Sequence, residues 1–462
     1  MSIKSISNID SKKLSPDEVD VLIVDKIEKV TSENSDIWTC PEFNRREYVH
    51  SFFQYPAMMI PVVQKKLIEI IIEAKPDIKN MVDPFMGSAT TFVASMENGL
   101  NCYGQDVNPL AILIAEARTG PYYIEALKKK YEILLEKIDV DNSVKIEAKF
   151  NNRTKWFKDK VSITLSKIVR AIRQEEQRAI RRFFWIVLAE TVRLSSNDRT
   201  STFKLHARKQ EEIDRRNFSA LDVFKLHMDK SIEDFELHAK LIKESGQLVN
   251  GNYTNKIDIT LQDSKQAIYS PTAAPYYDLL VTSPPYGDNK TTVPYGQHSY
   301  LPLQWIDHKD IRTKIDNEFL KTTSEIDSRS LGGKLKVGND EQALHQLFLK
   351  SPTFQNTYET IKSISSTKAL KVAAFIYDLS LTIDNIFSVM KKDSYQIWTS
   401  GNRCVAKIEV PNDEIITELI TNKGGRLVTK VRREIINKRM ARRNKETALM
   451  NNEDILIFRK ID

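Results

Sequence analysis

Cysteine, glycine and long apolar runs are all scarce in this chain of 462 residues. Its three cysteines, Cys40, Cys102 and Cys404, stand far apart without a C-x-x-C pair, which argues against a disulfide framework and a structural zinc site. Apolar runs such as FFWIVLA at 183–189 are too short to span a bilayer, and the first residues lack the apolar stretch of a secretory signal. We therefore expect a cytoplasmic protein with no membrane partner.

Positive and negative side chains are nearly balanced in number. Lys and Arg number 69 against 62 for Asp and Glu, so the net charge is +7 and the isoelectric point is near 8.9. That small excess is compatible with a polyanionic partner but does not require one. No spacing of histidines and carboxylates is typical of a metal site, so we expect no metal.

The first 120 residues predict half of a doubly wound α/β nucleotide-binding unit. An apolar helix over 57–74 is followed by the short strand MVDPF, the small-residue turn and helix GSATTFVASMENG, and the strand LNCYGQD, which ends in an acid. This order is typical of domains that bind a nucleotide at the carboxyl edge of a parallel sheet. Residues 1–120 are predicted to be the cofactor-binding half.

Residues 121–250 have helical periodicity, many charges and almost no glycine or proline, which predicts an α-helical insertion. Strand signals return at 256–263 and 276–286, so 251–462 is predicted to be the catalytic half of the domain. We expect a polar insertion at about 287–365 and strands at SYQIWTSG, CVAKIEVP and DILIFRK. A cationic run, RLVTKVRREIINKRMARRNK, precedes the last of these strands.

The segment DPFMGSATT, residues 83–91, carries small residues where a backbone can approach a ligand. Asp106 ends the next strand, where a carboxylate can accept both hydroxyls of a ribose, although it also suits the N-cap of a helix starting near Pro109. Asp263 stands in the analogous place one strand further on. It can accept from an adenine amine or simply cap a turn.

The tetrapeptide Ser283-Pro284-Pro285-Tyr286 follows a predicted strand and makes a stiff corner, because two prolines remove two donors and fix two φ angles. At the carboxyl edge of the sheet, this corner can aim a carbonyl and a hydroxyl at one point beside an aromatic ring. Such acceptors hold the protons of the exocyclic amine of a flipped base and leave its lone pair facing an electrophilic methyl group, while the ring stacks on the base.

Together, TSPPYGD and DPFMGSATT resemble the S-adenosylmethionine-dependent DNA amino-methyltransferases. Cytosine-N4 members of that family typically carry Ser-Pro-Pro-Tyr, whereas adenine-N6 members more often have Asp or Asn before the prolines. YVHSFFQYPAMMIP at 48–61 looks like the family segment that encloses the methionine end of the cofactor, and YGQDVNPLA resembles the ribose-binding strand. The resemblance implies an α/β fold: a doubly wound, mostly parallel, seven-stranded Rossmann-like methyltransferase sheet with a large helical insertion.

The resemblance also implies S-adenosylmethionine as cofactor and assigns site residues. The catalytic set is Ser283, Pro284, Pro285 and Tyr286. The cofactor set is Tyr55, Pro56, Asp83, Pro84, Phe85, Gly87, Ser88, Thr90, Asp106, Asn108, Asp263 and Ser264. Ala89 stands where the family usually has glycine, and its methyl group is tolerable if φ there is negative.

The implied partner is double-stranded DNA with a flipped target base. RAIRQEEQRAIRR in the insertion, the stretch 193–209, residues 287–365 and the basic run 426–445 are candidate DNA contacts, although each can equally be solvated surface. The predicted contacts are Arg193, Ser196, Arg199, Lys204, Arg432, Arg433, Lys438, Arg439 and Arg442.

We therefore expect methylation of cytosine N4 in a restriction-modification system or another prokaryotic defence context, with a cognate endonuclease encoded separately. Adenine-N6 methylation, RNA amine methylation and a non-catalytic DNA-binding scaffold remain alternatives. Cytosine-C5 chemistry is rejected, because it needs a thiolate usually found in a Pro-Cys pair, and no cysteine here follows a proline.

Overall fold

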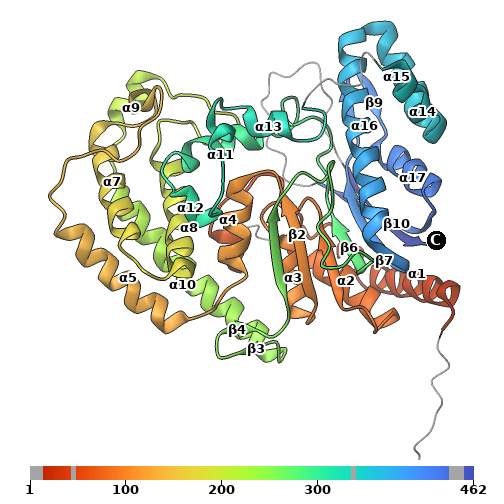
Figure 1. The fold of residues 1–462 in the computed structure, drawn as a ribbon, viewed down its shortest axis with the longest axis horizontal. Helices are drawn as coiled ribbons and strands as arrows, with labels where there is room; N and C mark the ends of the chain where they lie inside the picture. Colours follow the sequence, from red (N-terminus) through yellow and green to blue (C-terminus); the bar gives the residue numbers. More distant parts are fainter. Residues whose placement is uncertain (1–13, 43–47, 334–339, 436–451) are drawn as a thin grey trace, which may run out of the picture.

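The computed structural model describes residues 14–42, 48–333, 340–435 and 452–462. Its centre is a seven-stranded sheet in the order β10-β11-β7-β6-β1-β2-β5 (Figure 1). All strand pairs are parallel except the two made by β11. The strands are β1 (Asn80–Asp83), β2 (Asn101–Asp106), β5 (Ile257–Leu261), β6 (Tyr277–Thr282), β7 (Met390–Ser400), β10 (Gly425–Glu434) and β11 (Asn452–Lys460).

Both faces of the sheet are covered, because successive strand residues point to opposite sides and both sets are apolar. In β6, Leu279 and Val281 join the core cluster of one face, and Leu280 joins that of the other. The first face carries α1 (Pro16–Glu33), α2 (Pro61–Ala74), α3 (Thr90–Glu97) and α4 (Pro109–Arg118). The second carries α16 (Ser366–Val389) and α17 (Asn412–Asn422). The doubly wound, mostly parallel sheet is confirmed.

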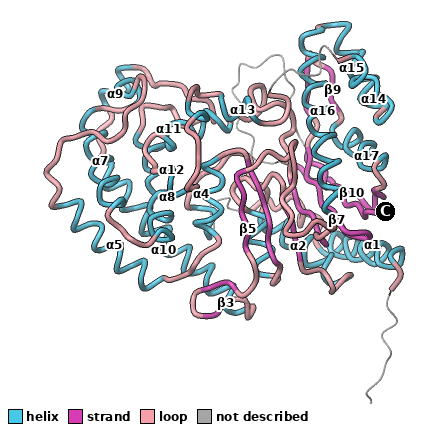
Figure 2. The backbone as a smooth tube through the Cα atoms, viewed as in Figure 1, coloured by secondary structure: helices cyan, strands magenta, loops and turns pink. Residues whose placement is uncertain are grey.

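A helical lobe, defined as residues 124–244, occupies one side of the molecule in Figures 1 and 2. It forms where the sequence predicts an insertion. Its helices are α5 (Ile124–Asp139), α6 (Arg153–Trp156), α7 (Asp159–Arg173), α8 (Arg178–Ser195), α9 (Gln210–Arg215) and α10 (Ala220–Glu244). Because α8 packs against α4, the lobe is attached to the sheet through the helix that follows β2. A hairpin of β3 (Leu248–Val249) and β4 (Asn252–Tyr253) leads back into the sheet.

The predicted polar insertion at 287–365 is divided between the two ends of the molecule. Its first part forms α11 (Tyr295–Leu303), α12 (His308–Ile311), η2 (Glu318–Leu320) and α13 (Glu325–Arg329). Helix α11 packs against α8 of the helical lobe. The second part forms α14 (Glu341–Lys350) and α15 (Pro352–Ile364), which pack against α16.

One strand expectation is wrong. CVAKIEVP forms a separate hairpin, β8 (Arg403–Val405) and β9 (Ile408–Val410), because Ala406 and Lys407 both take positive φ, at 53° and 66°, and turn the chain back. The cationic run, to which the sequence assigned no element, begins with β10, an edge strand whose cations pair with acids on β11.

Helix α16 is long and apolar enough to cross a membrane by length and composition, and within the described part of the chain no other helix meets that test. Its side chains are mostly buried, as expected for a helix that covers one face of a sheet.

Candidate active site

A pocket opens at the carboxyl edge of the sheet, where β1, β2, β5 and β6 all end. Most of the predicted site residues line it: Tyr55, Pro56, Pro84, Phe85, Gly87, Ser88, Thr90, Asp106, Asn108, Asp263, Ser264, Ser283 and Pro285. The topology therefore brings the two sequence motifs, about 200 residues apart, to one cavity.

Asp83 does not line the pocket but lies fully buried behind it. Its Oδ1 accepts from the Thr282 hydroxyl at 2.7 Å and the Phe85 amide at 3.0 Å, and its Oδ2 accepts from Thr91 at 2.7 Å. Burial raises its pKa to about 6 despite these three hydrogen bonds. The contacts tie the end of β6 to the loop after β1, so Asp83 supports the pocket rather than contacting a ligand in it.

The turn after β1 is built on left-handed backbone. Gly87 has φ of +49°, and a Cβ there would come within 3.3 Å of the Tyr55 ring. Ala89 also has positive φ, at 60°, so the condition of a negative φ, under which its methyl group would be tolerable, is not met. The conformation is held because the Ala89 amide donates to the Met86 carbonyl at 2.7 Å, and the fully buried guanidinium of Arg118 donates to the Ser88 carbonyl. The strain at Ala89 costs about 1 kcal/mol or more.

Asp106 sits at the end of β2 with both carboxylate oxygens engaged by backbone donors. The Gly87 amide donates to Oδ2 at 3.0 Å and the Asn108 amide donates to Oδ1 at 2.8 Å. Burial raises its pKa to about 6. Each oxygen keeps a lone pair free toward the pocket, which suits a pair of vicinal hydroxyl groups. The helix cap anticipated as an alternative for Asp106 is supplied instead by Asn108, whose Oδ1 accepts from the Leu110 amide at 3.0 Å.

Two tyrosines form one wall of the pocket. Tyr55 and Tyr295 have ring centroids 5.5 Å apart and ring planes tilted by 31°. The Asn108 amide holds this wall by donating to the Tyr55 hydroxyl at 3.1 Å and to Ser299 on α11 at 2.8 Å. Tyr295 thus belongs to the site although it carried no role in the sequence predictions.

The opposite side of the pocket is formed after β5. Ser264 donates to the Pro84 carbonyl at 2.6 Å and accepts from Gln105 at 3.0 Å, so its hydroxyl fixes the loop after β1. Asp263 pairs with Lys265 at 3.5 Å and keeps part of its carboxylate on the pocket.

The Ser-Pro-Pro-Tyr corner follows β6 as predicted. Ser283 and Pro285 face the pocket, Pro284 is buried, and Tyr286 is half-buried just beyond the lining. The Ser283 hydroxyl donates to the Tyr286 hydroxyl at 3.4 Å. Asn412, at the start of α17, donates to the Tyr286 carbonyl at 3.0 Å and so fixes the corner from below. A Cβ at Gly287 would lie 2.0 Å from the Arg403 guanidinium, so a larger residue there would displace that side chain.

Comparison with known proteins agrees with this geometry. No protein-family model matches the chain. It is 33% identical to the type II methyltransferase M.MvaI of Kocuria varians over 452 residues, which is 95% of each protein. The chain belongs to the type II DNA methyltransferases. Shorter matches link it to M.MjaII of Methanocaldococcus jannaschii, 37% identical over 99 residues, and to M.BsoBI of Geobacillus stearothermophilus, 29% identical over 111 residues.

These two matches cover 21% and 24% of this DNA methyltransferase and 17% and 21% of the relatives. The full-length match therefore carries the assignment. It confirms the DNA methyltransferase family, the link to DNA methylation and restriction-modification, and the fold. In the described residues, no group of three histidine, cysteine or acidic side chains is placed to hold a metal ion.

The predicted DNA contacts of the helical lobe are only partly on its surface. Arg193 is buried and pairs with Glu190 at 2.5 Å, and Ser196 is fully buried. Neither side chain can reach a phosphate from there, which corrects the prediction for both. Arg199 and Lys204 are exposed on a loop that contacts α11, where the Leu205 amide donates to Gln297 at 3.2 Å.

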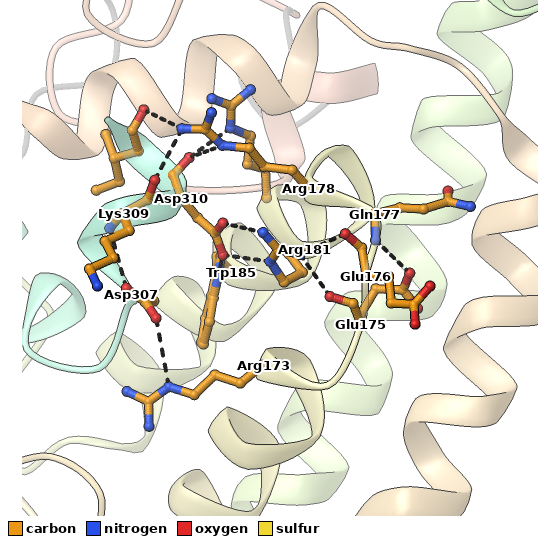
Figure 3. Close-up of polar contacts among 12 residues, drawn as sticks. Arg173, Glu175, Glu176, Gln177, Arg178, Arg181, Trp185, Asp307, Lys309 and Asp310 are labelled. Atoms are coloured by element: carbon orange, nitrogen blue, oxygen red, sulfur yellow. Dashed lines mark hydrogen bonds and ion pairs between the residues drawn. The ribbon is translucent and has the colours of Figure 1, made fainter. Parts of the chain in front are cut away.

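The arginines at the end of RAIRQEEQRAIRR make hydrogen bonds and ion pairs within the protein. Figure 3 shows how Asp310 on α12 gathers them: Arg181 binds both carboxylate oxygens, at 2.6 and 2.8 Å, and the Trp185 ring nitrogen donates at 2.8 Å. Arg178 donates to three backbone carbonyls of α12. This cluster, here called the arginine brace, fixes the helical lobe to the segment after the catalytic corner.

In the described part of the basic run 426–445, the predicted phosphate contacts form ion pairs with acids of the same chain. Arg432 is exposed but binds Asp454 at 2.9 Å, and Arg433 is buried against Glu453. Burial removes Arg433 from the predicted phosphate contacts. Lys438, Arg439 and Arg442 lie outside the described residues.

Sequence reasoning assigned no role to two residues at the site, Arg118 and Asn289, and left open whether Tyr295 lines the base pocket or continues a loop. Asn289 lines the pocket, and its buried Oδ1 has no hydrogen-bond partner among the described residues. Neither Arg118 nor Asn289 belongs to a recognisable motif. Only the position of Asn289, six residues after Ser283, carried a signal that could have been used.

Proposed function

We propose that this DNA methyltransferase transfers a methyl group from S-adenosylmethionine to the exocyclic N4 amine of a cytosine flipped out of double-stranded DNA. The observation that carries the proposal is that the Ser283 hydroxyl opens onto the same cavity as the Gly87 turn and Asp106. A methyl donor held by the turn and the acid therefore lies beside the acceptors of the catalytic corner.

The residues around the pocket fit the cofactor. The two free lone pairs of Asp106 suit ribose hydroxyls, Phe85 and Asp263 lie where an adenine ring and its amine can be held, and the Gly87–Ser88 turn suits the methionine end. When bound, S-adenosylmethionine supplies an electrophilic methyl group. The protein orients the base amine toward it, excludes water with the Tyr55–Tyr295 wall and offers acceptors for the amine protons.

Ser283 favours cytosine over adenine. A neutral hydroxyl and a proline-fixed carbonyl both accept from the two N–H groups of the amine, and the Tyr286 ring is placed to stack on the base and offset part of the unstacking cost. Arg199 and Lys204, on the loop beside α11, are the DNA contacts that we retain for this chain.

The test is chemical analysis of DNA methylated by the purified protein. We expect N4-methylcytosine after digestion of plasmid to nucleosides and separation by mass, and sequencing of the modified sites would give the recognition sequence. N6-methyladenine without N4-methylcytosine would replace cytosine by adenine as the target base. A Ser283→Ala variant should bind the cofactor normally and lose methylation.

In cells, we propose a cytoplasmic enzyme that protects DNA from a cognate restriction endonuclease encoded separately. The full-length match to a type II methyltransferase supports this context. DNA from cells that express the chain should resist one endonuclease, whose site matches the methylated sequence.

A further inference from the structure

Three polar groups lie in a row behind the catalytic corner. The Ser283 hydroxyl donates to the Tyr286 oxygen at 3.4 Å. The Tyr286 phenol in turn lies beside the carboxylate of Glu453, and the charge of that carboxylate acts on it. Burial, followed by the charge of Glu453, raises the pKa of Tyr286 well above its usual value, so the phenol keeps its proton and acts as the donor. The row runs from the pocket to an acid that no sequence motif contains.

The register of the sheet puts Glu453 at this place. Because β11 runs antiparallel to its neighbours, its first residues stand at the carboxyl edge, next to Ser400 at the end of β7. Thr282, which ends β6 just before the corner, pairs with Trp398 of the same strand β7. A residue at the beginning of the last strand thereby comes beside a corner 170 residues earlier in the chain.

The surroundings of Glu453 hold its side chain in position. Arg433 stands directly opposite it on β10, and the guanidinium binds the carboxylate at 2.7 and 2.8 Å. Both side chains are largely buried, with 7% and 15% of the surface of Arg433 and Glu453 exposed. The other groups that face the carboxylate are the phenols of Tyr286 and Tyr295. The next acid, Asp454, pairs instead with Arg432 and Lys430.

We propose that Glu453 is the final acceptor of the proton that the target amine loses during methyl transfer, and that the proton reaches it through the hydroxyls of Ser283 and Tyr286. The inference rests on the proposed function, since it needs a base amine at Ser283. It gives Tyr286 two separate tasks, with the ring stacking on the base and the hydroxyl passing a proton.

The step balances as follows. The amine lone pair forms the new C–N bond while the S–C bond breaks and its electron pair leaves on sulfur. The nitrogen then carries a positive charge and passes one proton to the Ser283 oxygen, as Ser283 passes its own to Tyr286 and Tyr286 passes its own to Glu453. A neutral methylated amine and a neutral carboxylic acid remain, and the acid later releases its proton to water. All donors in the row point in this direction.

Tyr286→Phe, Glu453→Gln and the double variant test the relay, because Phe keeps the ring and removes only the hydroxyl. In single-turnover assays with the full chain, S-adenosylmethionine and DNA, we expect each single variant to transfer the methyl group about 100-fold more slowly. The double variant should be no slower than the slower single one, since both changes cut one chain. Affinities for cofactor and DNA should stay within about twofold of wild type.

The dependence of the methylation rate on pH distinguishes a Glu453 that accepts a proton from a Glu453 that only stabilises the structure. The wild-type rate should fall as acid protonates a carboxylate, and Glu453→Gln should lack this acidic limb. Glu434→Gln, which removes an exposed carboxylate beside Arg433 on β10, is the matched control and should behave like wild type.

Each result decides between the two proposals. If wild type methylates no DNA amine, the proposed function itself fails. If wild type is active and either single variant reacts at the wild-type rate, the relay is wrong. Losses that multiply in the double variant, or an acidic limb that persists in Glu453→Gln, would assign Glu453 a structural role and overturn the relay as well.

Discussion

Two carboxylates, one lining the pocket and one in the arginine brace, show how this protein separates its site from its scaffold. Asp106 at the sheet edge is held only by backbone amides, and burial raises its pKa to about 6. Asp310 in the arginine brace opposes its own burial with Arg181 and Trp185, which hold its pKa below the usual value. A carboxylate that accepts only from backbone amides can still accept hydrogen bonds from a ligand. A carboxylate paired with arginine side chains instead stabilises the fold.

The largest effect is expected at the brace. Asp310→Asn should lower the free energy of unfolding by about 3 kcal/mol, because Arg181 keeps its backbone acceptors but loses its paired carboxylate in a largely buried place. Urea denaturation measures this change. Asp307→Asn is the control, since asparagine can keep the cap that Asp307 makes with the Lys309 amide and loses a long, partly exposed pair with Arg173 at 3.9 Å, so stability should change by less than about 0.5 kcal/mol. Equal effects of both variants would contradict the role of the brace.

Asp106→Ala should leave stability nearly intact and weaken S-adenosylmethionine binding by about 2 kcal/mol, roughly 30-fold, through loss of charged acceptors. Calorimetry measures the affinity, and Asp258→Ala on β5, outside the pocket lining, is the control. Unchanged affinity in Asp106→Ala would remove this acid from the cofactor site.

The pKa of about 6 for Asp106 predicts how cofactor affinity and stability change with pH. Cofactor affinity should fall as pH decreases through 6, because the ribose hydroxyls need the ionised acceptor, and this loss should be absent from Asp106→Ala. The raised pKa has the opposite effect on the ligand-free protein, whose free energy of unfolding gains from Asp106 as pH falls from 7 toward 5. Asp310, with a lowered pKa, contributes stability that is lost only at more acidic pH.

A smaller effect is expected at the turn that supplies the amide for Asp106. Gly87→Ala should lower stability by about 1 kcal/mol through its positive φ and also weaken cofactor binding, because the new methyl group presses on Tyr55. Gly246→Ala has the same backbone strain with nothing within 4 Å, so it should lose stability without losing cofactor affinity. Thermal unfolding and calorimetry together distinguish the two variants.

The smallest effect is expected for Arg199 and Lys204, the exposed cations on the loop beside α11. Arg199→Ala with Lys204→Ala should make the slope of log affinity for DNA against log salt shallower by about 1 to 2, one for each lost phosphate contact. Lys29→Ala, on α1 at the other end of the molecule, should leave the slope unchanged (Figure 1). An unchanged slope in the double variant would exclude this loop from the DNA interface.

Much of the sheet and pocket was predictable, because both depend on local patterns that sit at strand ends. The turn at Gly87 and the acid at Asp106 follow consecutive strands, and parallel topology carries each to the same edge. The cationic stretches were less predictable. Arg193 and Arg433 look like phosphate ligands in sequence, but each finds a carboxylate in the folded chain and is buried with it. Charge along a sequence does not reveal whether its partner is internal.

The sequence by itself determined the doubly wound arrangement, the turn at Gly87 and the corner at Ser283, because apolar periodicity, small-residue turns and paired prolines act over a few residues. The places of Tyr55 and Ser264 in the pocket were implied by the family resemblance. Only the tertiary structure decided where distant side chains meet. It placed Tyr295 against Tyr55, Asp310 among the arginines and Glu453 beside Tyr286. Such contacts depend on strand register and helix packing, which join residues far apart in the chain and leave no mark on the local pattern.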